Sequence, residues 1–155
     1  MSKVVFVDTS ILCEVLRVPG KSQQHQAVTD ELRARVTRGE TLVLPTASII
    51  ETGNHIAQLE HGDSRRERAH ALTTFLRATA KGEAPWRLHG AVWDGGFLTS
   101  ICDGPASCLS FPDMAAQKIG AGDVSVLAEA EHYRTRVASV TVEVWTLDAG
   151  LMAYT

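Results

Sequence analysis

The chain has 155 residues, of which 45% are hydrophobic and 21% are charged, a composition typical of one folded domain spanning residues 1–155. Its formal net charge of −3, from 18 acidic and 15 basic residues, excludes a generally basic nucleic-acid coat but allows a local basic rim. No apolar run approaches the roughly 20 residues of a membrane span, and no signal peptide is recognisable at the start, so we expect a cytoplasmic protein without membrane contact.

Three short apolar runs have the length and composition of β-strands. The first two are built from small or branched apolar residues. The third, VTVEVWT, alternates and is rich in β-branched residues. These runs predict strands over residues 4–7, 42–44 and 140–146.

Four segments between these runs have apolar residues at helical spacing. In the first, Val28, Leu32 and Val36 recur every four residues, and Gly39 is suited to the helix end. In the second, we expect Gly62 to end the helix. The helices are predicted within residues 21–40, 45–62, 63–82 and 120–134, the last starting near Asp123.

The segment 83–113 has no assignable pattern and is rich in glycine and proline. Its length and composition suggest an insertion beside a cleft, where it would shape substrate access or contact a partner. The three cysteines, Cys13, Cys102 and Cys108, contain no C-x-x-C pair, so ordinary reduced thiols are favoured over a disulfide or a zinc site.

Strands that alternate with helices predict an α/β fold with a mostly parallel sheet and helices on both faces. Sites in such folds form beyond the carboxyl ends of the strands. Asp8 directly follows the first predicted strand and Asp148 follows the last, while Glu51 comes soon after the second. Asp123 lies at a predicted helix start. Four separate segments therefore bring one carboxylate each to the same edge.

Each of these acids also has an ordinary structural interpretation. Asp8, Asp123 and Asp148 could cap helices, because Asp accepts hydrogen bonds from the free N–H groups of a first turn. Ser48 and Glu51 match the S-x-x-E pattern of a capping box. No single acid is therefore evidence of a site.

Together the four acids favour a metal site. Two like charges about 4 Å apart cost roughly 4 kcal/mol at an effective dielectric near 20, so a group of carboxylates must take up protons or a cation. Oxygen ligands select Mg²⁺ or Mn²⁺. Such a site is suited to phosphodiester hydrolysis, with Asp8, Asp123 and Asp148 as metal ligands and Glu51 as a ligand or as the group that orients the attacking water.

Four pieces of the chain, VVFVDTSILCEVL, LPTASIIETGNHI, GAGDVSVLAEA and VWTLDAGLMAYT, together resemble PIN-domain nucleases, in particular VapC-type toxins of bacterial toxin–antitoxin pairs. The resemblance implies a three-layer PIN-like fold and a Mg²⁺- or Mn²⁺-dependent endoribonuclease with catalytic residues Asp8, Glu51, Asp123 and Asp148. It also implies supporting roles for Thr9, Ser10 and Thr146. The partners expected with it are an RNA substrate, an antitoxin protein and a second copy in a homodimer.

Weaker signals favour structural roles. Asn54 lies one helical turn after Glu51 and could position a water, although a structural role is more common. His55 and His61 are six residues apart, which does not align them as ligands, and the basic stretch SRRERAH reads as a solvated helix face. Two other functions stay open: a degenerate PIN-like binding module without catalysis, and a metal-dependent phosphohydrolase acting on DNA or small phosphate esters.

Overall fold

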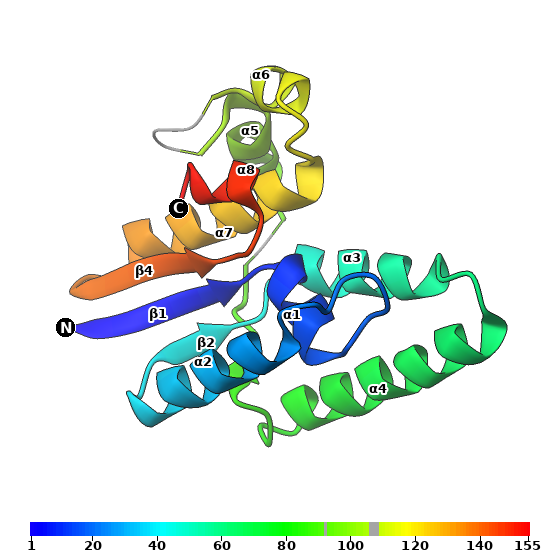
Figure 1. Cartoon of the computed structure of the whole chain (residues 1–155). Coiled ribbons are helices and arrows are strands. Elements are labelled where there is room, and N and C mark those ends of the chain that lie inside the picture. The colour runs from blue at the N-terminus through cyan, green and yellow to red at the C-terminus, as the bar shows by residue number, and fades with distance from the viewer. Residues whose placement is uncertain (92, 106–108) are drawn as a thin grey trace.

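The computed structural model describes residues 1–91, 93–105 and 109–155. Its strands form one four-stranded sheet, and helices lie on both sides of it (Figure 1). The strands are β1 (Ser2–Val7), β2 (Thr41–Val43), β3 (Trp86–Arg87) and β4 (Val140–Trp145). The helices are α1 (Thr9–Val15), α2 (His25–Thr37), α3 (Thr46–Ala57), α4 (Gly62–Ala80), α5 (Gly95–Asp103), α6 (Phe111–Ala116), α7 (Ala121–Arg136) and α8 (Ala149–Met152).

The sheet has the order β3-β2-β1-β4, and all three strand pairs are parallel. β1 lies between β2 and β4, with Val5 opposite Leu42 on one side and Glu143 on the other. The prediction of an α/β fold with a parallel sheet is therefore confirmed. Parallel pairing also means that the carboxyl ends of all four strands lie along one edge of the sheet.

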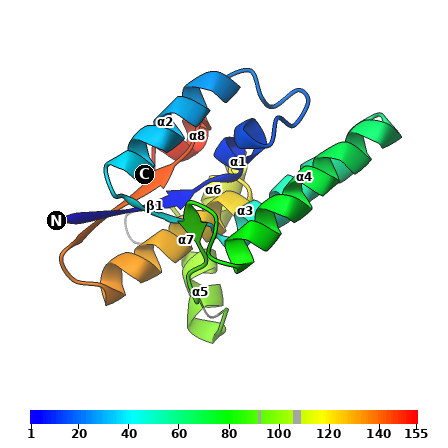
Figure 2. The same ribbon diagram turned by 90° about the horizontal axis from the view of Figure 1, so that it is seen from below.

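Both faces of the sheet are covered because the central strand β1 is apolar on both sides. Val5 and Val7 pack into a core beneath α1, α3 and α4, and Val4 and Phe6 pack into a second core beneath α7. Figure 1 shows α2 and α4 on one side of the sheet and α7, α5 and α8 on the other. Figure 2, seen from below, shows the long α4 running out beyond the sheet. Within the described ranges, no helix is long and apolar enough to span a membrane.

One predicted helix boundary is wrong, and the structural alternative considered for Glu51 is absent. Gly62 is the first residue of α4 and does not end the preceding helix, which stops at Ala57. The capping box is absent because α3 starts at Thr46, two residues before Ser48, and the Ser48 hydroxyl instead donates to the carbonyl oxygen of Val7 at 2.8 Å. Ser48 thereby ties the start of α3 to the end of β1.

The segment 83–113 is part of the fold. It contains the edge strand β3, whose Trp86 is buried and packs against Phe75 with 4.8 Å between ring centroids, and it contains α5 and the start of α6. Its described residues do not line the pocket that contains Asp8, Glu51, Asp123 and Asp148. Residues 92 and 106–108 of this segment, among them Cys108, lie outside the described residues.

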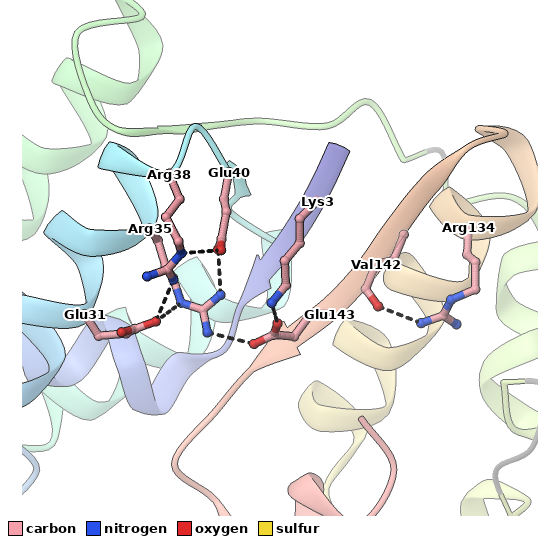
Figure 3. Close-up of polar contacts among 8 residues, drawn as sticks. All are labelled: Lys3, Glu31, Arg35, Arg38, Glu40, Arg134, Val142 and Glu143. Atoms are coloured by element: carbon pink, nitrogen blue, oxygen red, sulfur yellow. Dashed lines mark hydrogen bonds and ion pairs between the residues drawn. The ribbon is translucent and has the colours of Figure 1, made fainter. Parts of the chain in front are cut away.

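Arg35 of α2 ties the helix to the sheet near the amino ends of β1 and β2 (Figure 3). Two of its guanidinium nitrogens lie 2.8 Å from Glu40 Oε2 and 2.7 Å from Glu143 Oε1. The Cζ atom of the same guanidinium lies 4.7 Å from the ring centroid of Trp145. Lys3 also pairs with Glu143, and Arg38 also pairs with Glu40. Burial alone would raise the pKa of Glu40, but hydrogen bonds from Arg38 and Arg35 hold that pKa below its usual value.

Candidate functional site

Asp8 comes directly after β1, and Asp148 comes three residues after the end of the neighbouring parallel strand β4. Asp8 follows β1 and is the N-cap of α1, and its backbone N–H donates to the carbonyl oxygen of Trp145 at 3.0 Å. Asp148 is the N-cap of α8, and its Oδ1 accepts from the backbone N–H groups of Gly150 and Leu151 at 2.8 and 3.2 Å. Both acids therefore do cap helices, and the strand pairing places them at one end of the sheet.

Glu51 and Asp123 reach the same region from two helices. Glu51 lies in the second turn of α3, and its Oε2 accepts a hydrogen bond of 2.9 Å from Thr9 Oγ1 at the start of α1. Asp123 is the third residue of α7, whose N-cap is Gly120. Both side chains are half-buried.

The structure places all four predicted acids in the lining of one pocket of about 590 Å³. Asp8, Glu51, Asp123 and Asp148 come from four different elements and meet beyond the carboxyl ends of the strands, where ligands bind in open α/β sheets. Thr9, Ser10 and Asn54 line the same pocket. The pocket is therefore the candidate functional site.

Two hydroxyl groups hold Asp8 in one orientation. Its Oδ2 accepts from Ser10 Oγ and Thr146 Oγ1, each at 2.8 Å, and from the Ser10 backbone N–H at 3.3 Å. The two hydroxyls also accept from backbone N–H groups after β4: Leu147 donates to Ser10 and Asp148 donates to Thr146, at 2.9 and 3.0 Å. Ser10 and Thr146 thus fix the Asp8 carboxylate and join the ends of β1 and β4.

The other oxygen of Asp8, Oδ1, accepts no hydrogen bond from the described residues. Asp8 is only 2% exposed, and this oxygen is itself buried. An orphaned carboxylate oxygen in a buried position is costly unless a cation or a proton binds it. Since Asp8 lines the pocket, this oxygen fits the chemistry of a metal ligand.

Asp123 carries the electrostatic signature of the cluster. Its pKa is raised to about 7, first because burial disfavours the charged form and then because Asp8, Glu51 and Asp148 are negatively charged neighbours. The backbone of Gly120 acts in the opposite direction. Negative neighbours that raise the proton affinity of Asp123 in this way also favour a cation at the same place.

The four acids do not yet have the spacing of a formed metal site. Within residues 1–91, 93–105 and 109–155, no three Asp, Glu, His or Cys side chains are grouped closely enough to hold one ion together. The side chains of the four acids differ in how firmly they are held. Asp8 is the most firmly fixed of them, since three donors hold its Oδ2.

Sequence reasoning missed several other residues of the pocket. Glu14 is a fifth carboxylate of the lining, and it is buried with Oε2 accepting from the Gln24 backbone N–H at 3.1 Å. Lys21 brings a positive charge, and His55, interpreted as an ordinary helix residue, lines the pocket one position after Asn54. Lys21 lies in the loop between α1 and α2, and Gln24 is the N-cap of α2. Neither residue belongs to a periodic apolar pattern, so the sequence could not predict that they line the pocket.

Comparison of the chain with protein-family models and with curated proteins gives no match. The resemblance to PIN-domain nucleases therefore stays a prediction, and the functional argument depends on the geometry of the pocket.

Proposed function

We propose that this chain is a Mg²⁺- or Mn²⁺-dependent endoribonuclease with a PIN-like fold and that the acidic pocket is its active site. The observation that carries the proposal is the orphaned Oδ1 of buried Asp8, in a pocket that four further carboxylates line. Asp8, Asp123 and Asp148 would hold the ion. Helix capping alone explains the Oδ2 contacts of Asp8 but gives no reason for a second, buried oxygen without a donor.

A divalent ion bound here would lower the pKa of a bound water and offset charge on the phosphodiester. The protein's own groups divide the remaining work. Ser10 and Thr146 keep the Asp8 carboxylate in place, and Glu51, held by Thr9, orients the attacking water and accepts its proton. Asn54, next to Glu51 in the pocket lining, supplies a further hydrogen-bonding group for that water.

Lys21 is a positively charged residue of the pocket lining that can attract an RNA phosphate. It is exposed in the pocket lining, and it forms no ion pair with any acid in the described ranges. Its ammonium group is therefore available to a substrate phosphate, while the acids repel any part of the nucleic acid that does not bind the ion. As the resemblance suggests, the cellular role proposed is that of a toxin held inactive by an antitoxin protein.

Replacing Asp8 by Asn separates catalysis from capping. The Asn carbonyl oxygen can still accept from Ser10 and Thr146, and Asn caps helices about as well as Asp, so the fold should lose little stability. The amide group would replace Oδ1 and remove a charged ligand. We expect Mn²⁺-dependent cleavage of a mixed RNA pool to fall by roughly a hundredfold or more, at tenfold per 1.36 kcal/mol.

Asp94→Asn is the matched control. Asp94 is the N-cap of α5 and accepts from the Phe97 backbone N–H at 2.9 Å, but it does not line the acidic pocket. The control should cleave RNA at the wild-type rate. Equal cleavage by wild type and Asp8→Asn would reject the acidic pocket as the active site, and wild type without cleavage but with a tightly bound protein partner would favour a binding module instead.

A further inference from the structure

The Glu51 carboxylate occupies the space next to Gly122 that any other residue would need for its side chain. A Cβ atom built on Gly122 would lie 1.8 Å from Glu51 Oε1, 2.3 Å from its Cδ and 2.9 Å from its Oε2. All three distances are shorter than a van der Waals contact. Glu51 of α3 therefore lies directly against the first turn of α7, one residue before Asp123.

Gly122 has no conformational reason to be glycine. Its φ lies outside the left-handed region, whereas Gly39, which ends α2, has a φ of 74° that favours glycine. Gly122 is the second residue of α7, a position that any L-residue can adopt and that most stabilise better than glycine does. What glycine provides here is space, and the group that fills the space is a carboxylate of the candidate active site.

A hydrogen bond also holds the Glu51 carboxylate. Thr9 Oγ1 donates to Glu51 Oε2 at 2.9 Å, so the carboxylate is held between the start of α1 and the start of α7. A methyl group on Gly122 would push it toward the open pocket. The atoms that would have to move belong to the end of a flexible side chain and not to backbone or core, so the fold can accommodate the change while the site cannot.

We propose that Gly122 is a positioning residue that sets the location of the Glu51 carboxylate. This inference rests on the proposed function for its effect on catalysis, but the placement of Glu51 can be tested without any activity. It gives the G-A-G-D sequence at the start of α7 a role: Gly122 makes room for one acid of the pocket, and the next residue supplies another.

The test is Gly122→Ala, with Gly120→Ala as its matched control. A Cβ on Gly120, the N-cap of α7, would meet no atom within 4 Å. We expect Gly122→Ala to have an unchanged or higher Tm, roughly tenfold or more weaker Mn²⁺ binding by calorimetry, and a similar loss of RNA cleavage. Gly120→Ala should lower Tm slightly, because Ala is a poorer N-cap than Gly, and should bind Mn²⁺ normally.

The Glu51→Ala background shows whether Gly122 acts through Glu51. With the carboxylate gone, Gly122→Ala should have no further effect on Mn²⁺ affinity or cleavage. Equal losses in both backgrounds would overturn the inference, because Gly122 would then act on α7 or on Asp123. In metal-free protein, the ¹³Cδ chemical shift of Glu51 should change in Gly122→Ala and not in Gly120→Ala, and an unchanged shift would also overturn it. If wild type neither binds Mn²⁺ nor cleaves RNA, the proposed function fails, while the chemical shift still decides the role of Gly122.

Discussion

Two buried carboxylates, Asp8 and Glu129, each have one oxygen without a hydrogen-bond partner in the described part of the chain, and their surroundings differ. Both are 2% exposed. Asp8 lines the acidic pocket, where a cation can reach it, whereas Glu129 lies on the buried side of α7 and does not line that pocket. Asp8 can therefore be balanced by a metal ion, and Glu129 only by its own proton.

Protonation of Glu129 makes the stability of the protein depend on pH. Burial raises the pKa of Glu129 from 4.5 to about 7, against a smaller lowering by the nearby Trp93 side chain and the Thr46 backbone. Because the folded-state pKa is the higher one, its stabilising contribution is complete below about pH 4.5 and is lost as the pH rises through about 7. The part of this loss due to Glu129 should be about 2–3 kcal/mol of the free energy of unfolding, measured by urea denaturation between pH 5 and pH 8.

Glu129→Gln should remove this part of the pH dependence, since an amide stays neutral, and should make the variant more stable than wild type at pH 8. Glu131→Gln is the control, because Glu131 lies two residues away on the same helix and pairs with Arg134 at the surface. It should keep the wild-type slope of stability against pH. A wild-type slope in Glu129→Gln would show that another group, such as Asp123, carries the whole effect.

At the scale of the elements, long and periodic segments were predictable and short ones were not. The strands β1, β2 and β4 and the helices α2, α3, α4 and α7 all lie where apolar spacing predicts them. β3 has two residues, too few for any periodicity, yet Trp86 makes it part of the core. α5 and α6 lie in glycine- and proline-rich sequence. α1 follows Asp8, which the sequence analysis considered as a helix cap without predicting the extent of the helix.

The ion-pair group around Arg35 decides how firmly α2 is attached to the sheet. The side chain of Arg35 is 8% exposed, as is that of Glu40, so removing the guanidinium leaves Glu40 with Arg38 as its remaining partner and Glu143 with Lys3. We expect Arg35→Met to lower the free energy of unfolding by about 2–3 kcal/mol, measured by urea denaturation. The acidic pocket should keep its Mn²⁺ affinity, because Arg35 does not line it.

Arg33→Met is the corresponding surface change on α2. Arg33 has a side chain that is 73% exposed and pairs with Asp30 at 3.5 Å, so its loss should cost at most about 1 kcal/mol. Equal destabilisation by the two variants would mean that helix propensity, and not the buried ion pairs, explains the effect of Arg35→Met.

At the scale of the whole molecule, the parallel topology allowed the four acids to be predicted as neighbours. Asp8 and Asp148 follow adjacent strands, and the helices that carry Glu51 and Asp123 start at the same edge of the sheet. The rest of the pocket was not predictable, since Lys21 lies in a loop without periodicity and reaches the pocket through tertiary packing. The close contact between Gly122 and Glu51 could not be predicted from the sequence either, because it depends on how α3 and α7 pack against each other.

Divalent ions should stabilise the whole fold if the pocket binds them. A ligand that binds only the native state stabilises it by about 2.7 kcal/mol at a hundredfold excess over the dissociation constant. We expect Mn²⁺ and Mg²⁺ to raise the Tm of metal-free protein in proportion to the logarithm of their concentration. KCl at matched ionic strength is the control, and an equal rise in KCl would mean that general screening of the acids is responsible.

The pairing of β1 with β4 also affects when the pocket can exist during synthesis. Ser2 pairs with Val140 and Val7 with Trp145, so the first strand made has to wait for the last strand of the sheet. On a ribosome, Asp8, Glu51 and Asp123 emerge well before Thr146 and Asp148, and Asp8 lacks its Thr146 donor until then. A nascent chain therefore has no assembled acidic pocket until nearly all of these residues have been translated. For a protein that cleaves RNA, this order would protect its own messenger while the chain is still being made.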